Sequence, residues 1–107
     1  MSNLTLSLDA STSVTGWAVF DGLTLVESGA IKPKSKSFYE RGLLMTNELK
    51  MIQLRAIESY KKPFDYIVIE KNNVMGPNQQ SMMSIGIVTG MILSRLVADE
   101  VYFVNVS

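Results

Sequence analysis

The sequence of 107 residues contains no cysteine and no histidine. Without cysteine there is no disulfide and no thiolate zinc site, and without histidine there is no imidazole base, nucleophile or metal ligand. Any catalysis must therefore come from carboxylates, hydroxyls or lysines. An excess of charge is also missing, because ten basic residues balance ten acidic ones. The bulk charge therefore demands neither a nucleic acid nor an anionic membrane as partner, although a local patch can survive a zero sum.

Long hydrophobic runs are absent as well. The longest apolar stretch, residues 85–93, is far shorter than the roughly 20 residues that cross a bilayer, and the N-terminus lacks the pattern of a secretory signal. We therefore expect a cytoplasmic protein with no membrane partner. Hydrophobic residues make up 47% of the chain, which is enough to bury a core, and the length fits a single domain over residues 1–107.

The first third of the chain has the pattern of three antiparallel strands. Residues 4–9 alternate apolar and polar side chains, as in a strand with one buried face. After a small polar turn, residues 14–20 form a second candidate strand. The dipeptide Asp21-Gly22 then predicts a tight hairpin into a third strand, residues 23–31.

Helical periodicity begins after a polar connector. A helix is predicted from Phe38, with Ser37 as its N-cap and Pro63 beyond its end. The short apolar run of residues 66–69 predicts a central strand covered on both faces.

A second helix is predicted from Pro77 to about Ala98, followed by a last strand over residues 101–106. Apolar side chains, including Met82, Met83 and Met91, surround most of this helix, so we expect it to be mostly buried. Gly86 and Gly90 are one turn apart and are expected to let the helix approach the sheet closely.

The order β-β-β-α-β-α-β predicts an α/β fold. Three antiparallel strands are joined in one mixed sheet by two parallel strands, which follow right-handed crossovers, with helices on the faces. The simplest arrangement places the strand of residues 66–69 beside the first strand and the last strand outside it. Asp9 and Glu70 then end neighbouring parallel strands at the same edge of the sheet.

Two carboxylates in this position could share a divalent cation. Hard cations such as Mg²⁺ bind carboxylate oxygens in cages completed by water and phosphate, and a pair of such ions promotes phosphodiester cleavage. The same residues also have a structural interpretation, in which Asp9 caps the turn that follows it and Glu70 is solvated. Spacing alone leaves both interpretations open.

Two motifs carry a family resemblance. Residues 8–19, LDASTSVTGWAV, resemble the first catalytic hairpin of the RuvC-type Holliday junction resolvases, where an Asp precedes a short Ser-containing turn and Val-Thr-Gly-aromatic. Residues 67–70, IVIE, resemble the strand that carries the family's second acid, at the matching interval. The resemblance covers essentially the whole chain and implies a ribonuclease H-like fold. It makes Asp9 and Glu70 the catalytic residues and the ligands of Mg²⁺ or Mn²⁺.

The implied activity is that of a magnesium-dependent endonuclease that resolves four-way or branched DNA in recombination and repair. The resemblance also implies a homodimer, because two-fold protein symmetry matches the two cleavage points of a junction. The small size and weak basicity would suit a phage-encoded member.

The end of the sequence departs from the family pattern. Family members complete the site with two further acids on a C-terminal helix, whereas this sequence ends at Ser107. Asp99 and Glu100 precede the last strand, so we expect them at the opposite edge, on the order of 15–20 Å from the site at about 3.3 Å per residue. We therefore expect a form that lacks the C-terminal helical part and has little activity by itself.

A basic segment lies within the neutral whole. Eight basic residues outnumber three acids over residues 32–62. In its connector KPKSKS, Lys32, Lys34 and Lys36 alternate with small residues, which suits contact with DNA phosphates without base readout. This interpretation takes the connector as a flexible basic stretch, and the alternative is a solvated loop kept soluble by its lysines.

Three residues directly after Glu70 complete the candidate DNA contacts. Lys71 is expected at the rim of the site, as a phosphate contact or as a charge partner of the carboxylate. Asn72 and Asn73 open the loop in which the resolvases of this family insert an aromatic side chain at the junction core. This sequence has asparagine at the nearest position.

Two other functions remain open. An Asp on a first strand followed by a small polar hairpin also resembles the phosphate-binding loop of actin-like and sugar-kinase-like ATPases, so the chain could be an ATP-binding fragment. Those proteins need a second domain and usually a Gly in that turn. The third possibility is a module derived from a nuclease that binds DNA without performing chemistry.

Overall fold

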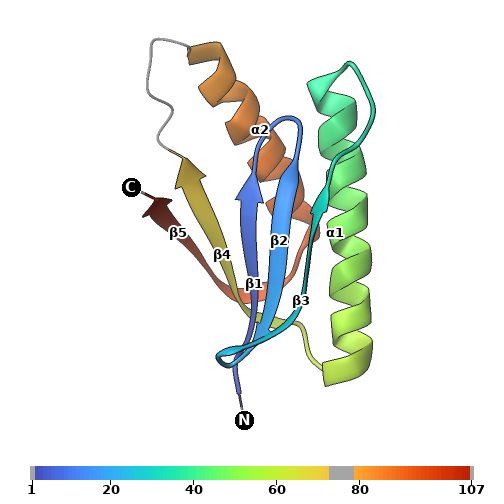
Figure 1. The fold of residues 1–107 in the computed structure, drawn as a ribbon, viewed down its shortest axis with the longest axis vertical. Helices are drawn as coiled ribbons and strands as arrows, with labels where there is room; N and C mark the ends of the chain where they lie inside the picture. Colours follow the sequence, from blue (N-terminus) through green and yellow to red (C-terminus); the bar gives the residue numbers. More distant parts are fainter. Residues whose placement is uncertain (1, 73–78, 107) are drawn as a thin grey trace.

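The computed structural model describes residues 2–72 and 79–106. Figure 1 shows its elements in the predicted order. They are β1 (Leu4–Ala10), β2 (Thr15–Asp21), β3 (Thr24–Ile31), α1 (Phe38–Tyr60), β4 (Phe64–Asn72), α2 (Gln79–Arg95) and β5 (Ala98–Val106). The α/β class predicted from the sequence is confirmed.

The strands form one mixed sheet in the order β3-β2-β1-β4-β5. β1 pairs antiparallel with β2, and β2 pairs antiparallel with β3. β4 lies parallel to β1 on one side and to β5 on the other. The predicted position of the fourth strand beside the first is therefore confirmed.

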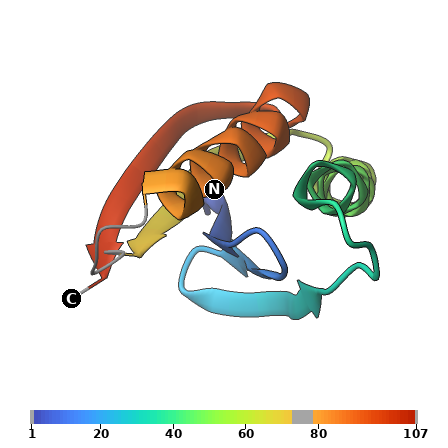
Figure 2. The ribbon, with the colours of Figure 1, turned by 90° about the horizontal axis from the view of Figure 1, so that it is seen from above.

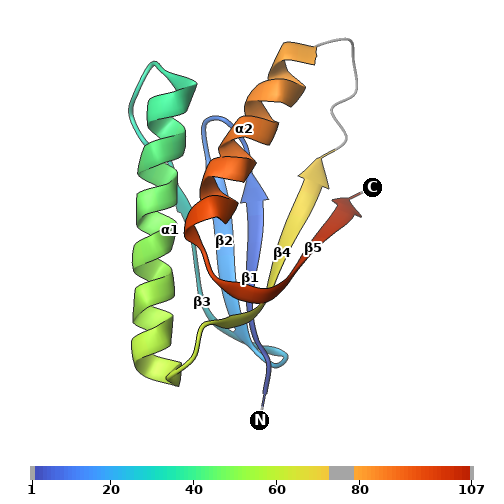
Figure 3. The ribbon, with the colours of Figure 1, turned by 180° about the vertical axis from the view of Figure 1, so that it is seen from behind.

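Both helices cover the same face of the sheet (Figures 2 and 3). The connections from β3 to β4 and from β4 to β5 run in the same direction across the sheet, and right-handed crossovers then place both helices on one side. The core lies between this face and the helices. It is built mainly by Leu4, Leu6 and Leu8 of β1, Ile67 and Ile69 of β4, Met45 and Leu49 of α1, and Val88 and Ile92 of α2.

The opposite face of the sheet carries no helix within the described ranges, and the expectation that β4 is covered on both faces is wrong. Ile67 and Ile69 are buried against the helices, whereas Tyr66 and Val68 alternate with them and are half-buried. Tyr66 instead packs against the ring of Tyr102 on β5, with 5.7 Å between ring centroids.

The predicted burial of α2 is also wrong. Among the side chains described for this helix, only Val88 and Ile92 are buried, while Met82 and Met83 are 55% and 66% exposed. The helix contacts the core through Val88 and Ile92 and packs against α1 through Met91, while Met82, Met83 and Ile87 face outward. An apolar composition all round the helix gives no sign of which side faces the core.

The glycines of α2 do not bring it close to the sheet. A Cβ added to Gly86 or Gly90 would meet nothing within 4 Å, so both lie on the outer side of the helix. Close packing is instead made by Gly42 of α1, where an added Cβ would lie 3.0 Å from the sulfur of Met91. The expected role of Gly86 and Gly90 is therefore wrong, and Gly42 allows the two helices to approach.

Several element ends follow local rules. Ser37 caps α1 as predicted, since its side chain accepts a hydrogen bond from the Glu40 N–H. The β2–β3 turn lies one residue later than expected, because Asp21 pairs with Thr24. Gly22 supplies the positive φ of +61° that this turn requires.

The second crossover is shorter than predicted, because α2 ends at Arg95 and β5 already begins at Ala98. The predicted helix start at Pro77 lies outside the described residues. No helix in the described part of the chain is long and apolar enough to cross a membrane.

Candidate functional site

The two acids singled out in the sequence lie on neighbouring strands at one edge of the sheet. The parallel register pairs Leu8 with Ile69, and Asp9 and Glu70 are the next residues on their strands. Neighbouring strands are about 4.8 Å apart. Since Leu8 and Ile69 are buried against the helices, the alternation of side chains directs both acids to the open face. Asp9 is exposed and Glu70 is half-buried.

Gly16 lies across from Asp9 on the other neighbouring strand. The antiparallel register pairs these two residues, and a Cβ added to Gly16 would lie 3.8 Å from the Cβ of Asp9. Of the two residues that flank Asp9 on the neighbouring strands, Gly16 has no side chain. Glu70, which follows Ile69 on β4, does have one. The Gly of the Val-Thr-Gly motif thus leaves space beside the first acid.

Ser11 closes the turn that follows Asp9. Its Oγ donates a hydrogen bond to the Val14 carbonyl at 2.8 Å and accepts from the N–H groups of Val14 and Ser13 at 3.0 and 3.2 Å. The backbone N–H of Ser11 also donates to the Val14 carbonyl, at 3.0 Å. Ser11 therefore fixes the shape of this turn.

Asp99 and Glu100 lie within β5, near its start, and not before the last strand as expected, although they are still away from the two acids. Glu100 pairs with Tyr66, four residues before Glu70 on β4, which separates the two levels by about 13 Å at 3.3 Å per residue. Within the described ranges, no group of three or more acidic side chains could hold a metal ion. Two carboxylates suit one hard divalent cation whose other positions are filled by water or phosphate, and not a two-metal site with a full acidic set.

The lysine connector, residues 32–37, runs from β3 to the start of α1 at the same edge as the ends of β1 and β4 (Figure 1). Lys32, Lys34 and Lys36 are exposed. Ser35, between two of them, donates a hydrogen bond from its Oγ to Glu40 of α1 at 2.6 Å. This hydrogen bond joins the connector to the helix, and its three lysines are exposed to solvent.

Arg41 is a residue of this edge that the sequence did not single out. Its Nε donates a hydrogen bond to the Thr12 carbonyl at 2.6 Å, and its Nη1 donates to the Ser35 carbonyl at 2.8 Å. Thr12 belongs to the turn after Asp9, and Ser35 belongs to the lysine connector. The guanidinium thus joins both segments to α1. The only sign in the sequence is the position of an arginine one turn into a helix that directly follows the connector.

Other predicted DNA contacts are placed less fully. Lys71 and Asn72 are the last two residues of β4 and share the edge through their backbone, while Asn73 lies outside the described residues. The basic segment of residues 32–62 does not form one patch, because Lys61 and Lys62 follow the other end of α1. That helix has 23 residues, which corresponds to a length of about 34 Å.

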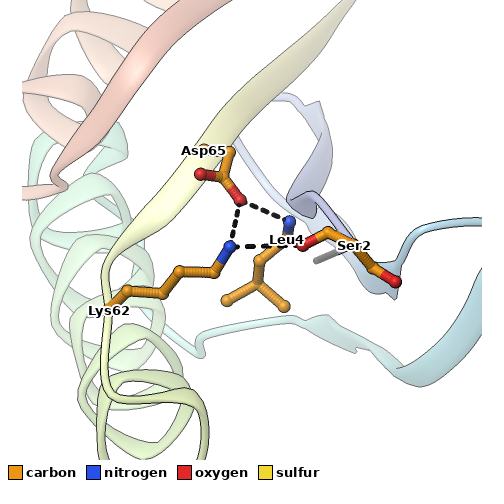
Figure 4. Close-up of polar contacts among 4 residues, drawn as sticks. All are labelled: Ser2, Leu4, Lys62 and Asp65. Carbon is orange, nitrogen blue, oxygen red and sulfur yellow. Dashed lines mark hydrogen bonds and ion pairs between the residues drawn. The ribbon is translucent and has the colours of Figure 1, made fainter.

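The opposite edge of the sheet holds a cluster of paired charges (Figure 4). Lys62 donates from its Nζ to the Oδ2 of Asp65 at 2.7 Å and to the Ser2 carbonyl at 3.2 Å. The same Oδ2 accepts from the Leu4 N–H at 2.7 Å. The hydrogen bond from Lys62, followed by that from Leu4, lowers the pKa of Asp65 below its ordinary value of 3.8. This network fastens the start of β1 to the start of β4.

The mixed sheet, its strand order and its two crossover helices define a ribonuclease H-like fold. The structure is similar to RuvC of Thermus thermophilus in complex with a Holliday junction substrate, with a TM-score of 0.68, 13% sequence identity, and coverage of 96% of this chain and 65% of that one. A second Thermus thermophilus RuvC structure gives a TM-score of 0.62 at 14% identity, covering 95% and 63% of the two chains. An exopolyphosphatase from Cytophaga hutchinsonii gives 0.55 at 10% identity, covering 96% and 34%.

The resemblance to RuvC-type resolvases is confirmed at the level of the fold, which is what such low identities show. The chain spans about 65% of the length of the RuvC structure it matches. No family model matches the sequence, and no curated protein matches it.

Proposed function

We propose that this chain binds branched DNA, with four-way junctions as its substrate class, and that Asp9 and Glu70 hold one Mg²⁺ or Mn²⁺ ion. The observation that carries the proposal is the register that pairs Leu8 with Ile69 and so sets the two acids side by side. The fold of RuvC, which has been seen with a Holliday junction substrate, supports DNA as the partner.

The proposed roles of the acids and of the DNA-contacting residues follow from their positions. Asp9, exposed at the edge, would supply a carboxylate oxygen that solvent and a DNA phosphate can reach, and the half-buried Glu70 would supply a second from a more fixed side chain. A bound divalent ion would polarise a phosphodiester and lower the pKa of its water. Lys32, Lys34 and Lys36, together with Lys71, Asn72 and Asn73, would contact the DNA backbone.

With only these two carboxylates, we propose weak cation binding and little cleavage by the chain alone. That residues 1–107 form a single domain stays a prediction, as do a cytoplasmic location and a phage origin.

The metal site can be tested by Mn²⁺-induced broadening of backbone amide signals in NMR. We expect broadening centred on Asp9 and Glu70, and a loss of Mn²⁺ affinity of about tenfold or more in Asp9→Asn and in Glu70→Gln. Glu100→Gln is the matched control. Glu100 lies on the same face of the sheet, on β5 next to β4, but near the start of these strands and not where β1 and β4 end. An equal loss of Mn²⁺ affinity in all three variants, or no loss in any of them, would contradict the site.

DNA binding can be tested by fluorescence anisotropy with a four-way junction and a linear duplex of equal length. We expect tighter binding to the junction in Mg²⁺ or Mn²⁺. Efficient junction cleavage by the purified chain would contradict the proposed low activity. Thermal stabilisation by ATP with no response to junction DNA would replace this proposal with the ATPase fragment. Unchanged metal and DNA binding in Asp9→Asn would favour the module without chemistry.

A homodimer is the proposed assembly, and the outer side of α2 is the surface we assign to the second copy. Arg95 is its only charged residue, so two copies related by a two-fold axis would meet without like charges. Gly86 and Gly90 lack side chains on this outer side and allow a close approach. Met82, Met83 and Ile87 are exposed around them.

This assembly can be tested by sedimentation equilibrium. Ile87→Lys is expected to give monomers. Leu54→Lys is the matched control, because Leu54 on α1 is 48% exposed against 42% for Ile87, and it is expected to leave the dimer intact. Dimers in both variants, or monomers of the unmodified chain, would contradict the interface.

A further inference from the structure

The carboxyl edge of the sheet is the end at which β1 and β4 finish and which carries Asp9 and Glu70. Arg41 links two segments of this edge that are far apart in the sequence. Its guanidinium reaches the carbonyl of Thr12, three residues after Asp9, and the carbonyl of Ser35, between two exposed lysines. Both hydrogen bonds are short, at 2.6 and 2.8 Å, and both are part-buried. The acid-bearing strand end and the lysine connector are therefore held in a fixed relation by one side chain.

The charge of Arg41 is not neutralised by a carboxylate. Both of its acceptors are backbone carbonyls, whereas Arg55 and Lys62 form ion pairs with Glu27 and Asp65. The adjacent Glu40 accepts its hydrogen bond from the Ser35 hydroxyl instead. A half-buried, oriented cation thus stands at the same edge as three exposed lysines and the two acids of the candidate site, so that cationic groups are available to a phosphate on the side of the acids where the lysine connector lies.

The chemistry of the side chain explains why arginine occupies this position. The planar guanidinium presents donors in a rigid fork, so Nε and Nη1 can reach two carbonyls in different directions at the same time. A lysine has one flexible ammonium and would keep the charge while losing the fixed geometry of the two hydrogen bonds. Replacing Arg41 by lysine therefore tests the role of the two hydrogen bonds while the positive charge is kept.

We propose that Arg41 is a positioning residue for DNA phosphates. It holds the turn after Asp9 and the lysine connector together, so that Lys34 and Lys36 contact the backbone of the same DNA strand that reaches Asp9. Ordering these segments before binding reduces the entropy lost when DNA binds. This inference rests on the proposed function, because it assumes that the carboxyl edge binds DNA.

The first test needs no DNA. Amide hydrogen exchange is measured for the unmodified chain, Arg41→Lys and Arg41→Gln, with Arg55→Lys as the matched control on the same helix. We expect faster exchange over residues 11–14 and around Ser37 in both Arg41 variants, and unchanged exchange there in the control. Protection that is unchanged in both Arg41 variants overturns the positioning role. Global unfolding in either variant is recognised by faster exchange in the core strands, and the other variant then decides.

The second test uses the salt dependence of junction binding. Each phosphate contact contributes about 0.9 to the slope of log K against log salt concentration. If Arg41 positions the lysines, Arg41→Gln lowers the magnitude of the slope by the amount that about two phosphate contacts or more contribute. Arg41→Lys lowers it as well, although the charge is retained. A loss of only one contact in Arg41→Gln with no change in Arg41→Lys would show a simple charge effect and overturn the inference.

The two failures can be told apart. If the unmodified chain does not bind junction DNA, the proposed function is wrong, and the DNA role of Arg41 with it, whatever the exchange result. If it binds but Arg41→Lys matches it in both exchange and salt slope, only the inference about Arg41 is wrong.

Discussion

The two ends of the parallel strands differ in whether their charged side chains form ion pairs within the protein. At the end where β1 and β4 begin, Lys62 and Asp65 bind each other, and Asp65 also accepts from the Leu4 N–H. At the end where these strands finish, Lys32, Lys34 and Lys36 form no ion pair with any described residue, and Arg41 bonds only to carbonyls. Charges that pair within the protein support the fold, whereas the exposed lysines, which lie at the same edge as Asp9 and Glu70, remain available to a phosphate.

The comparison also explains why function and stability should separate in mutants. Substitutions at the edge of paired charges should lower stability without touching DNA or metal binding. Substitutions at the carboxyl edge should change binding, except where they remove the hydrogen bonds that shape its turn.

The largest expected effect on stability comes from that exception. Ser11→Ala removes the hydroxyl that makes three hydrogen bonds in the turn after Asp9, and should lower the free energy of unfolding by about 1–3 kcal/mol. Urea unfolding measures it. Ser94→Ala is the control, because its exposed hydroxyl makes a single bond to the Met91 carbonyl, and it should cost about 0.5 kcal/mol or less. Equal costs would show that the turn does not depend on Ser11.

A smaller effect is expected from Asp65→Asn at the opposite edge, and it should depend on pH. Because folding lowers the pKa of Asp65, its carboxylate stabilises the folded state above the ordinary value near 3.8, and this contribution is lost as the pH falls through the lower folded value. The variant should therefore melt at a lower temperature than the unmodified chain at pH 7, and the difference should shrink in acid. Melting curves followed by circular dichroism at both pH values check this.

Two results would argue against the paired edge as a stabilising element. One is a melting difference for Asp65→Asn that does not change with pH. The other is an equal loss in Glu27→Gln, whose ion pair with Arg55 joins side chains 49% and 55% exposed and should contribute little.

The smallest effect is expected from Gly16→Ala. The added Cβ would make an ordinary contact, 3.8 Å from the Cβ of Asp9, so stability should change by about 0.5 kcal/mol or less. Gly29→Ala should cost more, since its Cβ would lie 3.1 Å from the Trp17 ring. Thermal unfolding of both variants gives the order, and the reverse order would contradict the packing described for β2.

The position of the two acids could be predicted from the sequence because few topologies satisfy its pattern. Alternating residues fixed the buried face of β1, and the handedness of crossovers placed β4 beside it with a parallel register. The join made by Arg41 could not be predicted in this way. Its acceptors are backbone carbonyls, which every residue carries, so the partners of Arg41 leave no signature in the sequence.

The misjudged burial of α2 has a different physical cause. Periodicity identifies the inner side of a helix by contrast between apolar and polar residues, and α2 offers almost no contrast. Val88 and Ile87 are similar in character, yet the first is fully buried and the second is 42% exposed. The direction of Gly86 and Gly90 followed only from the three-dimensional packing.

The sole tryptophan of the chain makes unfolding observable without a label. Trp17 pairs with Leu8 in the register, directly next to the pair of Asp9 and Gly16. Its half-buried indole packs over Gly29. Since its partner Leu8 is buried and Trp17 itself packs against the core, tryptophan fluorescence reports unfolding from a single known position, on the helix-covered face beneath the two acids.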